Sequence, residues 1–495
     1  MPTFTEDRPA VGGALFGYLV DQLPDGASVL VAGPHDDALI DTLAARTAVT
    51  CLVRSQPQAV ELEARGLDVL CGTLAKVTDA DHYDVVVALD GLDRLCSVEG
   101  PQYDWMESLQ ALKRTLRPGG TLLLAVENEL GVHRLVDPVS ATSADADSDW
   151  RPLGEFDTKP GNPARLSACL SAEDLAVDWL GTAWPLPSAP TLIATPNALV
   201  TGPTDALAAV TAGAVGRAYA SMAVLSDPRR LAAAAVRGGL GAELAAAWLV
   251  VAHRAPRPAA ALSLPPVLFG DGPVLELAPG ADGVWHRRVI RAAPEEDLAA
   301  LNGPLPTGRL LEEVLLGACL RQDLPQLRHL LTGWIAALPD ATPDNIVVHH
   351  DTFALLDPSV PPAGEDVLSR FAQVLLGGGY AHPWPAATDL LTLTSILRGA
   401  AGLPDAVPGI PLDAEWPLPD SRREHEEQLR ALRRQLADAA SRAQWYEREL
   451  NKRDRELRKA RLQISAFSGT VSYRVAKLGF GVARKARNRI RKGLK

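Results

Sequence analysis

Cysteine is scarce and scattered in this sequence. The chain of 495 residues has five cysteines, none with the Cys-x-x-Cys spacing of a metal or redox motif. We therefore expect reduced, buried cysteines and no disulfide framework. Long apolar runs are also missing: the most apolar helical stretch, 231–253, is interrupted by Arg237 and Glu243 and does not predict a membrane span. The start, MPTFTEDRPA, lacks the apolar core of a secretory signal, so we expect a cytoplasmic chain.

Charge is unevenly distributed along the sequence. The net charge of the whole chain is −11, and its last 30 residues carry nine basic side chains and no acid, so the rest stands at −20. We expect the body to repel nucleic acid and the tail, 466–495, to bind an anionic membrane surface, with nucleic acid as the rival partner of the tail. Apolar residues at helical spacing in 471–482 would face the lipid. The basic residues assigned to membrane contact are Arg484, Lys485, Arg487, Arg489, Arg491 and Lys492.

The stretch 112–131, LKRTLRPGGTLLLAVENELG, organises the first 200 residues. Gly119 and Gly120 allow a tight turn, and the continuous apolar run 121–126 suits a strand buried on both faces of a parallel sheet. Further strands are expected at 28–32, 49–53 and 83–89. This arrangement resembles class I S-adenosylmethionine (SAM) methyltransferases. The resemblance implies an α/β, Rossmann-like methyltransferase domain over residues 1–200, with SAM as cofactor.

Several positions depart from the pattern of that family. Its first strand runs into a loop with a leading acid and three glycines, whereas here Gly33 is followed by His35 and Asp37. Its second strand ends in an acid that accepts hydrogen bonds from the ribose, and Arg54 stands there, a group that can only donate. Asp90 opens the loop after the strand at 83–89. The residues that the resemblance assigns to this degenerate cofactor site are Gly33, His35, Arg54 and Asp90.

Residues 201–405 read as a helical connector followed by a second domain. The stretches 204–223 and 228–253 are rich in Ala and Leu, and we expect both to be helical. A β-hairpin is expected over 274–290, and long helices after it. Next come Asp340, Asn345 five residues later, a short hairpin, and Asp357.

This Asp-x4-Asn, hairpin and Asp series resembles the catalytic loop of protein and small-molecule kinases. The resemblance implies an α+β kinase-like domain with Asp340 as base and Asn345 and Asp357 as magnesium ligands. That chemistry also needs a lysine on the nucleotide phosphates, and no lysine occurs between Lys159 and Lys452. We therefore do not expect magnesium with ATP, and call the domain degenerate. The alternative is that Asp340 and Asn345 close a β-turn.

A heptad pattern occupies residues 421–465, after a Pro-rich linker at 406–420. Five heptads rich in Arg and Glu predict a long coiled coil, although Arg453 interrupts the d positions once. Its apolar seam would need a partner, so we expect self-association as a dimer or trimer; a lone surface helix is the alternative. The a positions are Leu429, Leu436, Ala443, Leu450, Leu457 and Ile464.

The order of these parts resembles the bifunctional methyltransferase/kinase proteins that terminate bacterial O-antigen chains. The resemblance implies cell-surface polysaccharide assembly, peripheral binding to the inner face of the cell membrane, and glycosyltransferases or a lipid-linked glycan as partners. Two hypotheses follow. One is a SAM-dependent methyltransferase acting on a surface sugar. The other is a non-catalytic scaffold that keeps both folds as docking surfaces and organises glycan-synthesis enzymes through its coiled coil.

Overall fold

The protein has two compact units, Met1–His425 and Glu426–Lys495. A computed structural model describes residues 9–78, 82–96, 100–101, 103–137, 158–220, 222–255, 262–292, 299–363, 366–387, 389–404, 420–469 and 471–492. Residues 406–419 of the expected Pro-rich linker lie outside the described part.

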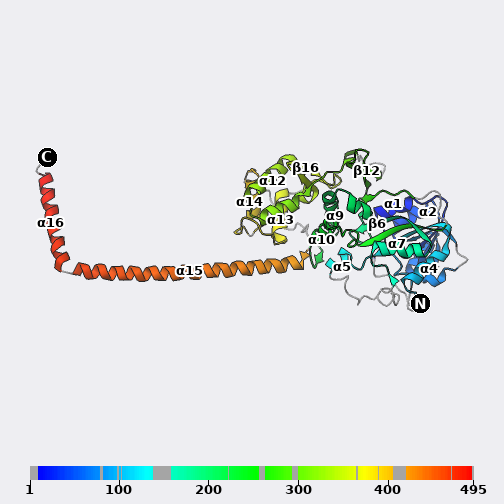
Figure 1. Ribbon diagram of the computed structural model, residues 1–495, viewed down its shortest axis with the longest axis horizontal. Coiled ribbons are helices and arrows are strands. Elements are labelled where there is room, and N and C mark those ends of the chain that lie inside the picture. The colour runs from blue at the N-terminus through cyan, green and yellow to red at the C-terminus, as the bar shows by residue number, and fades with distance from the viewer. Residues whose placement is uncertain are drawn as a thin grey trace. The chain divides into compact units, whose positions relative to one another are not determined.

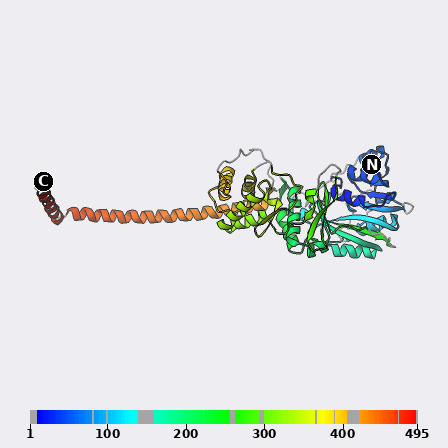
Figure 2. The same cartoon turned by 90° about the horizontal axis from the view of Figure 1, so that it is seen from above.

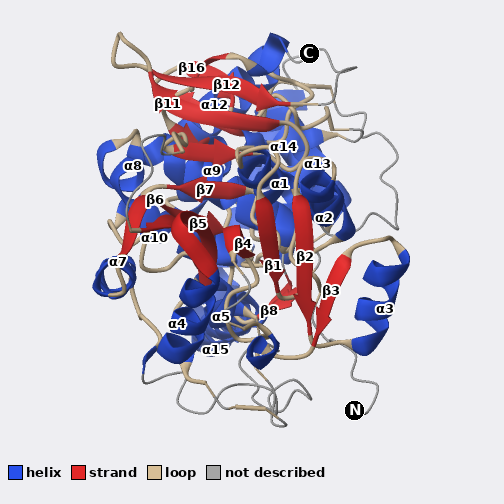
Figure 3. Ribbon diagram, turned by 90° about the vertical axis from the view of Figure 1, so that its right-hand side faces the viewer, coloured by secondary structure: helices blue, strands red, loops and turns tan. Residues whose placement is uncertain are grey.

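A twelve-stranded sheet forms the centre of the first unit (Figures 1 and 3). Its first five strands are parallel and stand in the order β3-β2-β1-β4-β5. This is the doubly wound order of a Rossmann-like sheet, as predicted, and the strands expected at 28–32, 49–53, 83–89 and 121–126 are all confirmed. The bounds are β1 (Ser28–Ala32), β2 (Ala48–Val53), β3 (Asp68–Cys71), β4 (Tyr83–Ala88) and β5 (Leu116–Glu127).

The other strands continue the sheet beyond β5. They are, from β5 outward, β9 (Ala247–Arg254), β6 (Leu175–Trp184), β7 (Leu192–Ala194), β10 (Val267–Phe269), β11 (Val274–Pro279), β12 (Trp285–Arg291) and β13 (Gly303–Pro304). The predicted hairpin over 274–290 is confirmed as β11 and β12, but it belongs to this large sheet. β9 is antiparallel to both of its neighbours, β5 and β6.

The prediction of a helix over 228–253 is wrong for the second half of that range. Only α10 (Pro228–Arg237) is helical, and 247–254 is the strand β9. The seven residues of β9 from Ala247 to His253 are all buried, and a run buried on both faces has no alternation that would distinguish a strand from a buried helix. Because β9 lies between β5 and β6, the expected division at residue 200 cuts through the sheet.

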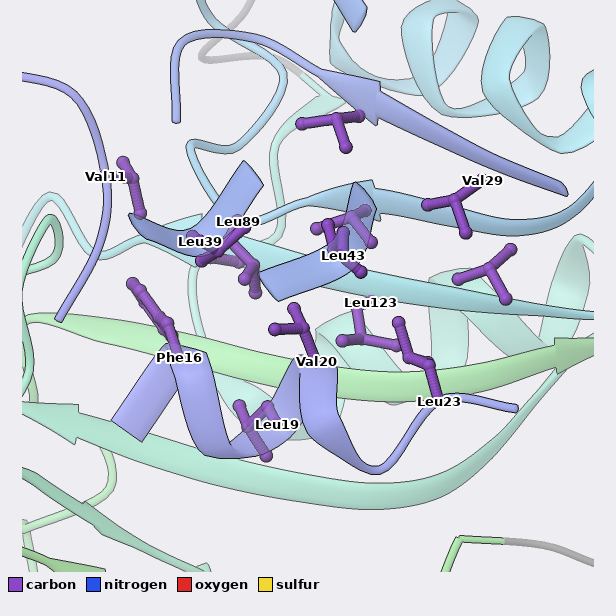
Figure 4. Packing of buried hydrophobic residues seen from close by; sticks show 14 of the residues in the cluster. Val11, Phe16, Leu19, Val20, Leu23, Val29, Leu39, Leu43, Leu89 and Leu123 are labelled. Atoms are coloured by element: carbon purple, nitrogen blue, oxygen red, sulfur yellow. The ribbon is translucent and has the colours of Figure 1, made fainter. Parts of the chain in front are cut away.

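Helices cover both faces of the parallel half. Successive residues of a strand point to opposite faces. Val29 and Leu123 pack with α1 (Ala14–Asp21), α2 (Asp37–Ala44) and α3 (Gln56–Ala64), as Figure 4 shows for Phe16 and Val20 of α1. Leu30 and Leu122, one position along, pack with α4 (Trp105–Thr115) and α7 (Pro163–Ala172) on the other face.

The extended half of the sheet shares its core with a smaller three-stranded sheet. Leu275 of β11 and Val347 of the small sheet belong to one apolar cluster. The helices of that cluster are α5 (Val132–Val136), α8 (Pro196–Thr201), α9 (Thr204–Ala218) and α10. The small sheet consists of β14 (Arg309–Leu310), β15 (Ile346–His349) and β16 (Thr352–Leu355).

Four further helices surround the small sheet with a core of their own. They are α11 (Leu311–Leu320), α12 (Leu324–Ala337), α13 (Val367–Gly377) and α14 (Leu390–Ala400). We call residues 309–404 the helical part. Short 3-10 turns stand at Leu74–Lys76, Ala299–Leu301 and Pro343–Asn345.

The chain leaves the first unit through a short parallel strand pair. β17 (Asp420–Ser421) pairs with β8 (Ala223–Val224). α15 (Arg422–Gly469) begins directly after β17, and α16 (Val471–Lys492) follows it (Figures 1 and 2). A long helix over the heptads is thus confirmed, while its pairing into a coiled coil stays a prediction. Within the described residues, no helix is long and apolar enough to cross a membrane.

Candidate functional site

The four residues assigned to the cofactor site lie at the carboxyl edge of the parallel strands. This edge is where open α/β sheets bind ligands. Gly33 follows β1 with a φ of 94°, in the left-handed region that favours glycine. A Cβ atom on Gly33 would lie 3.4 Å from the Cβ of Asp90, which follows β4. The structure therefore brings Gly33 and Asp90 close together.

His35 fills the space beside this turn. Its side chain is buried, and its Nδ1 lies 3.0 Å from the carbonyl oxygen of Gly33 while the backbone N–H of Leu89 donates to Nε2 at 3.3 Å. These partners fit the neutral ring with its proton on Nδ1. Burial lowers the pKa of His35 to about 4, with Arg94 adding to the effect. His35 is a buried side chain that connects the β1 loop to the end of β4.

Asp90 is neutralised by Arg94, four residues further on. Nε of Arg94 donates to Oδ2 of Asp90 at 2.6 Å, Nη2 donates to Oδ1, and both side chains are more than nine-tenths buried. Nη2 of Arg94 also donates to the carbonyl oxygen of Pro9 at 3.2 Å. Both carboxylate oxygens of Asp90 thus accept from one guanidinium.

Arg54, which follows β2, makes a structural hydrogen bond. Its Nη1 donates to the carbonyl oxygen of Cys96 at 2.9 Å, and the residue is 5% exposed. A guanidinium has no acceptor atom, so Arg54 does not replace the acid that would hold ribose hydroxyls.

The segment before α1 pairs with the backbone of the β1 loop, which the sequence did not predict. The N–H of Val11 donates to the carbonyl oxygen of Pro34 at 3.2 Å, and the N–H of Asp36 donates to that of Val11 at 2.8 Å. Gly12 is required here because a Cβ atom would lie 1.6 Å from a carboxylate oxygen of Asp36. The Gly-Gly pair at 12–13 was the sequence feature from which this pairing could have been predicted.

The residues present at this edge of the sheet therefore do not fit SAM. Backbone groups of the β1 loop are paired, His35 fills space beside the turn, and the acceptor for the ribose hydroxyls is missing.

A second ionic cluster at this edge was also missed. Glu127, the last residue of β5, accepts at Oε1 from Nε of Arg134 at 2.8 Å and lies 3.0 Å from Nε2 of His133. Burial acts to raise the pKa of Glu127, but His133 and Arg134 outweigh it and hold the pKa well below its usual value. Nζ of Lys159 lies 3.3 Å from Glu129 and 3.5 Å from Asp93. Each acid of this cluster lies beside a basic side chain.

Two of the kinase-like residues, Asn345 and Asp357, connect the ends of the β15–β16 hairpin. Nδ2 of Asn345 donates to the backbone carbonyl of Asp357, whose N–H donates back to Oδ1, both at 2.9 Å. Oδ1 of Asp357 accepts from the N–H of Ser359 at 3.0 Å, and Oδ2 lies 3.7 Å from Nη2 of Arg217. Asp340 is exposed, and its backbone carbonyl accepts from Ala363 at 2.8 Å. Asn345 thus bonds across the ends of the hairpin, whereas Asp340 contributes a backbone carbonyl, so the alternative that both residues close a β-turn stays a prediction.

No metal centre is evident in the part of the chain that the structure describes, where no three His, Cys, Asp or Glu residues gather to hold an ion. On α16, Arg484, Lys485 and Arg487 are exposed. The side chains of Arg489, Arg491 and Lys492 lie outside the described part.

Comparisons with known proteins give similarities to solved structures at low TM-scores. No protein-family model matches this chain, and no curated protein matches it. Among solved structures it is similar to the cyclase SpnF, with 13% identity, a TM-score of 0.27, and coverage of 49% of this chain and 81% of that one. It is also similar to the N-methyltransferase NodS from Bradyrhizobium japonicum, with 13% identity, a TM-score of 0.23, and coverage of 33% of this chain and 81% of that one. A SAM-dependent methyltransferase from Methanosarcina mazei is similar with 10% identity, a TM-score of 0.27, and coverage of 48% of this chain and 96% of that one.

These low scores carry no argument about activity. The parallel β3-β2-β1-β4-β5 order, with antiparallel β9 set between β5 and β6, is class I methyltransferase-like. The first unit therefore contains a class I methyltransferase-like fold.

Proposed function

We propose that this protein is a non-catalytic, methyltransferase-like scaffold that self-associates through α15 and serves bacterial cell-surface polysaccharide assembly. The observation that carries the proposal is the filling of the carboxyl edge by the chain itself. His35 spans the β1 loop and the end of β4, and Arg94 takes both oxygens of Asp90. A cofactor would have to displace buried, mutually satisfied polar groups, which is costly.

The kinase-like residues support the same proposal. A magnesium site needs carboxylate and amide oxygens that point toward the ion. Here Oδ1 of Asn345 accepts from the backbone of Asp357, and Oδ1 of Asp357 accepts from Ser359. The Asn345 side chain thus holds the ends of the hairpin together and the Asp357 side chain bonds Ser359, so the helical part would act as a docking surface.

The polysaccharide and membrane parts of the proposal rest on the order of the parts and on the tail. The exposed basic residues of α16 suit an anionic inner membrane surface. Glycosyltransferases or a lipid-linked glycan would be the partners assembled there.

Calorimetric titration of SAM and S-adenosylhomocysteine into the full chain tests the proposal. We expect no binding heat at ligand concentrations up to about 1 mM. Micromolar binding that is lost in Gly33→Trp but kept in Gly26→Trp would contradict the scaffold. Gly26 is a matched control because it also has positive φ, lies before β1 at the opposite edge, and has open space around its Cα.

A SAM-dependent methyltransferase is the second candidate, because Gly33 keeps the tight turn after β1 and the sheet keeps the class I order. The amount of surface polysaccharide made by a producing bacterium distinguishes the scaffold from the methyltransferase. The scaffold predicts that deleting residues 466–495 lowers polysaccharide output while Gly33→Trp does not. The methyltransferase predicts that both changes lower it.

A further inference from the structure

A buried ionic cluster joins α10 to the first turn of α11. Nη1 of Arg229 donates to Oε1 of Glu312 at 3.0 Å, and Nη2 donates to Oδ2 of Asp227 at 2.9 Å. The side chains of Arg229, Glu312 and Asp227 are 14%, 8% and 5% exposed. Oη of Tyr380, after α13, lies 3.5 Å from the same Asp227 oxygen. One arginine thus connects the helices over the sheet with the helical part.

A second ion pair beside it is more exposed to solvent. Nη1 and Nη2 of Arg237 donate to the two carboxylate oxygens of Glu313 at 3.0 and 2.7 Å, and these side chains are 28% and 25% exposed. Two adjacent glutamates at the start of α11 therefore meet two arginines of α10. Only the Glu312 pair is shielded from water, so only there does ionisation carry a large desolvation cost.

The buried cluster has more acid than base. Asp227 and Glu312 share the single guanidinium of Arg229, so the three groups carry a net charge of −1 when all are ionised. Burial raises the pKa of Glu312 to about 7, against the opposing effect of Arg229, and further carboxylates add to the rise. The charged and titratable groups around the cluster are Arg229, Arg230, Asp227, Asp344, Glu313 and Tyr380.

The cluster stands next to the strand pair from which α15 departs. Asp227 caps the start of α10 and lies three residues after Val224, the last residue of β8. The N–H of Arg423 in the first turn of α15 donates to the carbonyl oxygen of Leu225 at 3.0 Å. A change at Asp227 would therefore act close to the base of α15.

We propose that Glu312 is the pH-sensitive element of a latch between α10 and α11. With Glu312 protonated, Asp227 and Arg229 balance each other and the latch is closed. With Glu312 ionised, the excess negative charge weakens the contact, and the start of α11 and the adjoining β8 open more often. A carboxyl group that is harder to ionise in the closed state opens as the pH rises, so opening increases through the neutral range. The latch does not depend on whether the carboxyl edge of the sheet binds SAM.

Hydrogen exchange of the full chain, corrected for intrinsic exchange rates, tests the latch. We expect peptides covering 222–229 and 311–316 to exchange roughly tenfold faster at pH 8 than at pH 6 in the wild type. Glu312→Gln should remove this difference. Glu313→Gln, the control at the solvated pair, should keep it.

Two results would overturn the latch. One is equal corrected exchange of these peptides at pH 6 and pH 8 in the wild type, which requires no variant to fold. The other is a Glu312→Gln protein that keeps the wild-type difference. Peptides of β1 and β4 serve as an internal reference, because these strands lie in the sheet away from the cluster and should show no pH difference.

Discussion

At the residue scale, the chain keeps titratable groups in the site neutral or paired. His35 makes one hydrogen bond as donor and one as acceptor, which only the neutral ring allows. Asp90 is held by Arg94, and Glu127 by Arg134 and His133. These partners tie the loops after β1, β4 and β5 to one another or to the strands. The edge of the sheet is thereby stabilised by bonds that a ligand would otherwise make.

His35 makes the stability of the protein sensitive to acid. Its pKa is about 4 in the folded protein, below the ordinary 6.5, so the unfolded chain takes up the proton first as the pH falls. Stability is retained above pH 6.5 and is lost between 6.5 and 4, by up to about 3 kcal/mol. Urea unfolding at a series of pH values should show a smaller loss between pH 6.5 and 5 in His35→Gln than in the wild type.

The matched control for this prediction is His329→Gln. His329 is 62% exposed and paired with exposed Asp351, so its removal should leave the pH profile unchanged. Equal slopes in the wild type and His35→Gln would show that His35 does not control the acid response.

At the scale of the elements, α15 and α16 carry many exposed apolar side chains. Five a-position side chains of α15 are between 53% and 74% exposed, and Val471, Val475, Leu478 and Val482 of α16 between 62% and 77%. A helix of 48 residues with a bare apolar seam is not expected to remain single in water.

We expect α15 to self-associate through this seam. Leu450→Glu places a charge in the middle of the a positions, and it should shift the protein from oligomer to monomer in sedimentation experiments at micromolar concentration. Arg455→Glu, at an f position on the outer face, changes charge more strongly and should leave the oligomer intact. A monomeric wild type would contradict the coiled coil.

We expect α16 to bind anionic membranes. Each basic residue near such a surface contributes ~1 kcal/mol, so replacing Arg484, Lys485 and Arg487 together by Gln should weaken binding to vesicles containing phosphatidylglycerol roughly 100-fold. The same three-residue exchange at Arg430, Arg433 and Arg434 of α15 is the control. Binding that is as strong on neutral vesicles, or unchanged in the α16 variant, would exclude the electrostatic role.

At the scale of the whole molecule, the fold of the first unit depends on chain segments far apart in sequence. β9 enters the sheet between β5 and β6 although some 60 residues separate it from β6 along the chain. One apolar cluster then joins β10 and β11 to α9, α10 and β15. The sheet and the helical part are consequently not independent in their packing.

A fragment of residues 1–200 should therefore fail to fold, because it lacks the strand that completes the centre of the sheet. Residues 1–425 contain all twelve strands and should fold. Thermal unfolding followed by circular dichroism should be cooperative for 1–425 and absent or broad for 1–200. A sharp, cooperative transition of the shorter fragment would show that β9 is dispensable.

Local patterns in the sequence were sufficient for the parallel strands, the β11–β12 and β15–β16 hairpins, the long helix over the heptads and the position of Gly33. Each depends on residues close together in sequence, where apolar periodicity and turn residues report which faces are buried. Tertiary structure alone decided that 247–254 is a strand, that Arg94 neutralises Asp90, and that Arg229 meets Glu312 from 83 residues away. Partners of buried charges and of central strands are set by the packing of distant segments, and local periodicity carries no information about which segments meet.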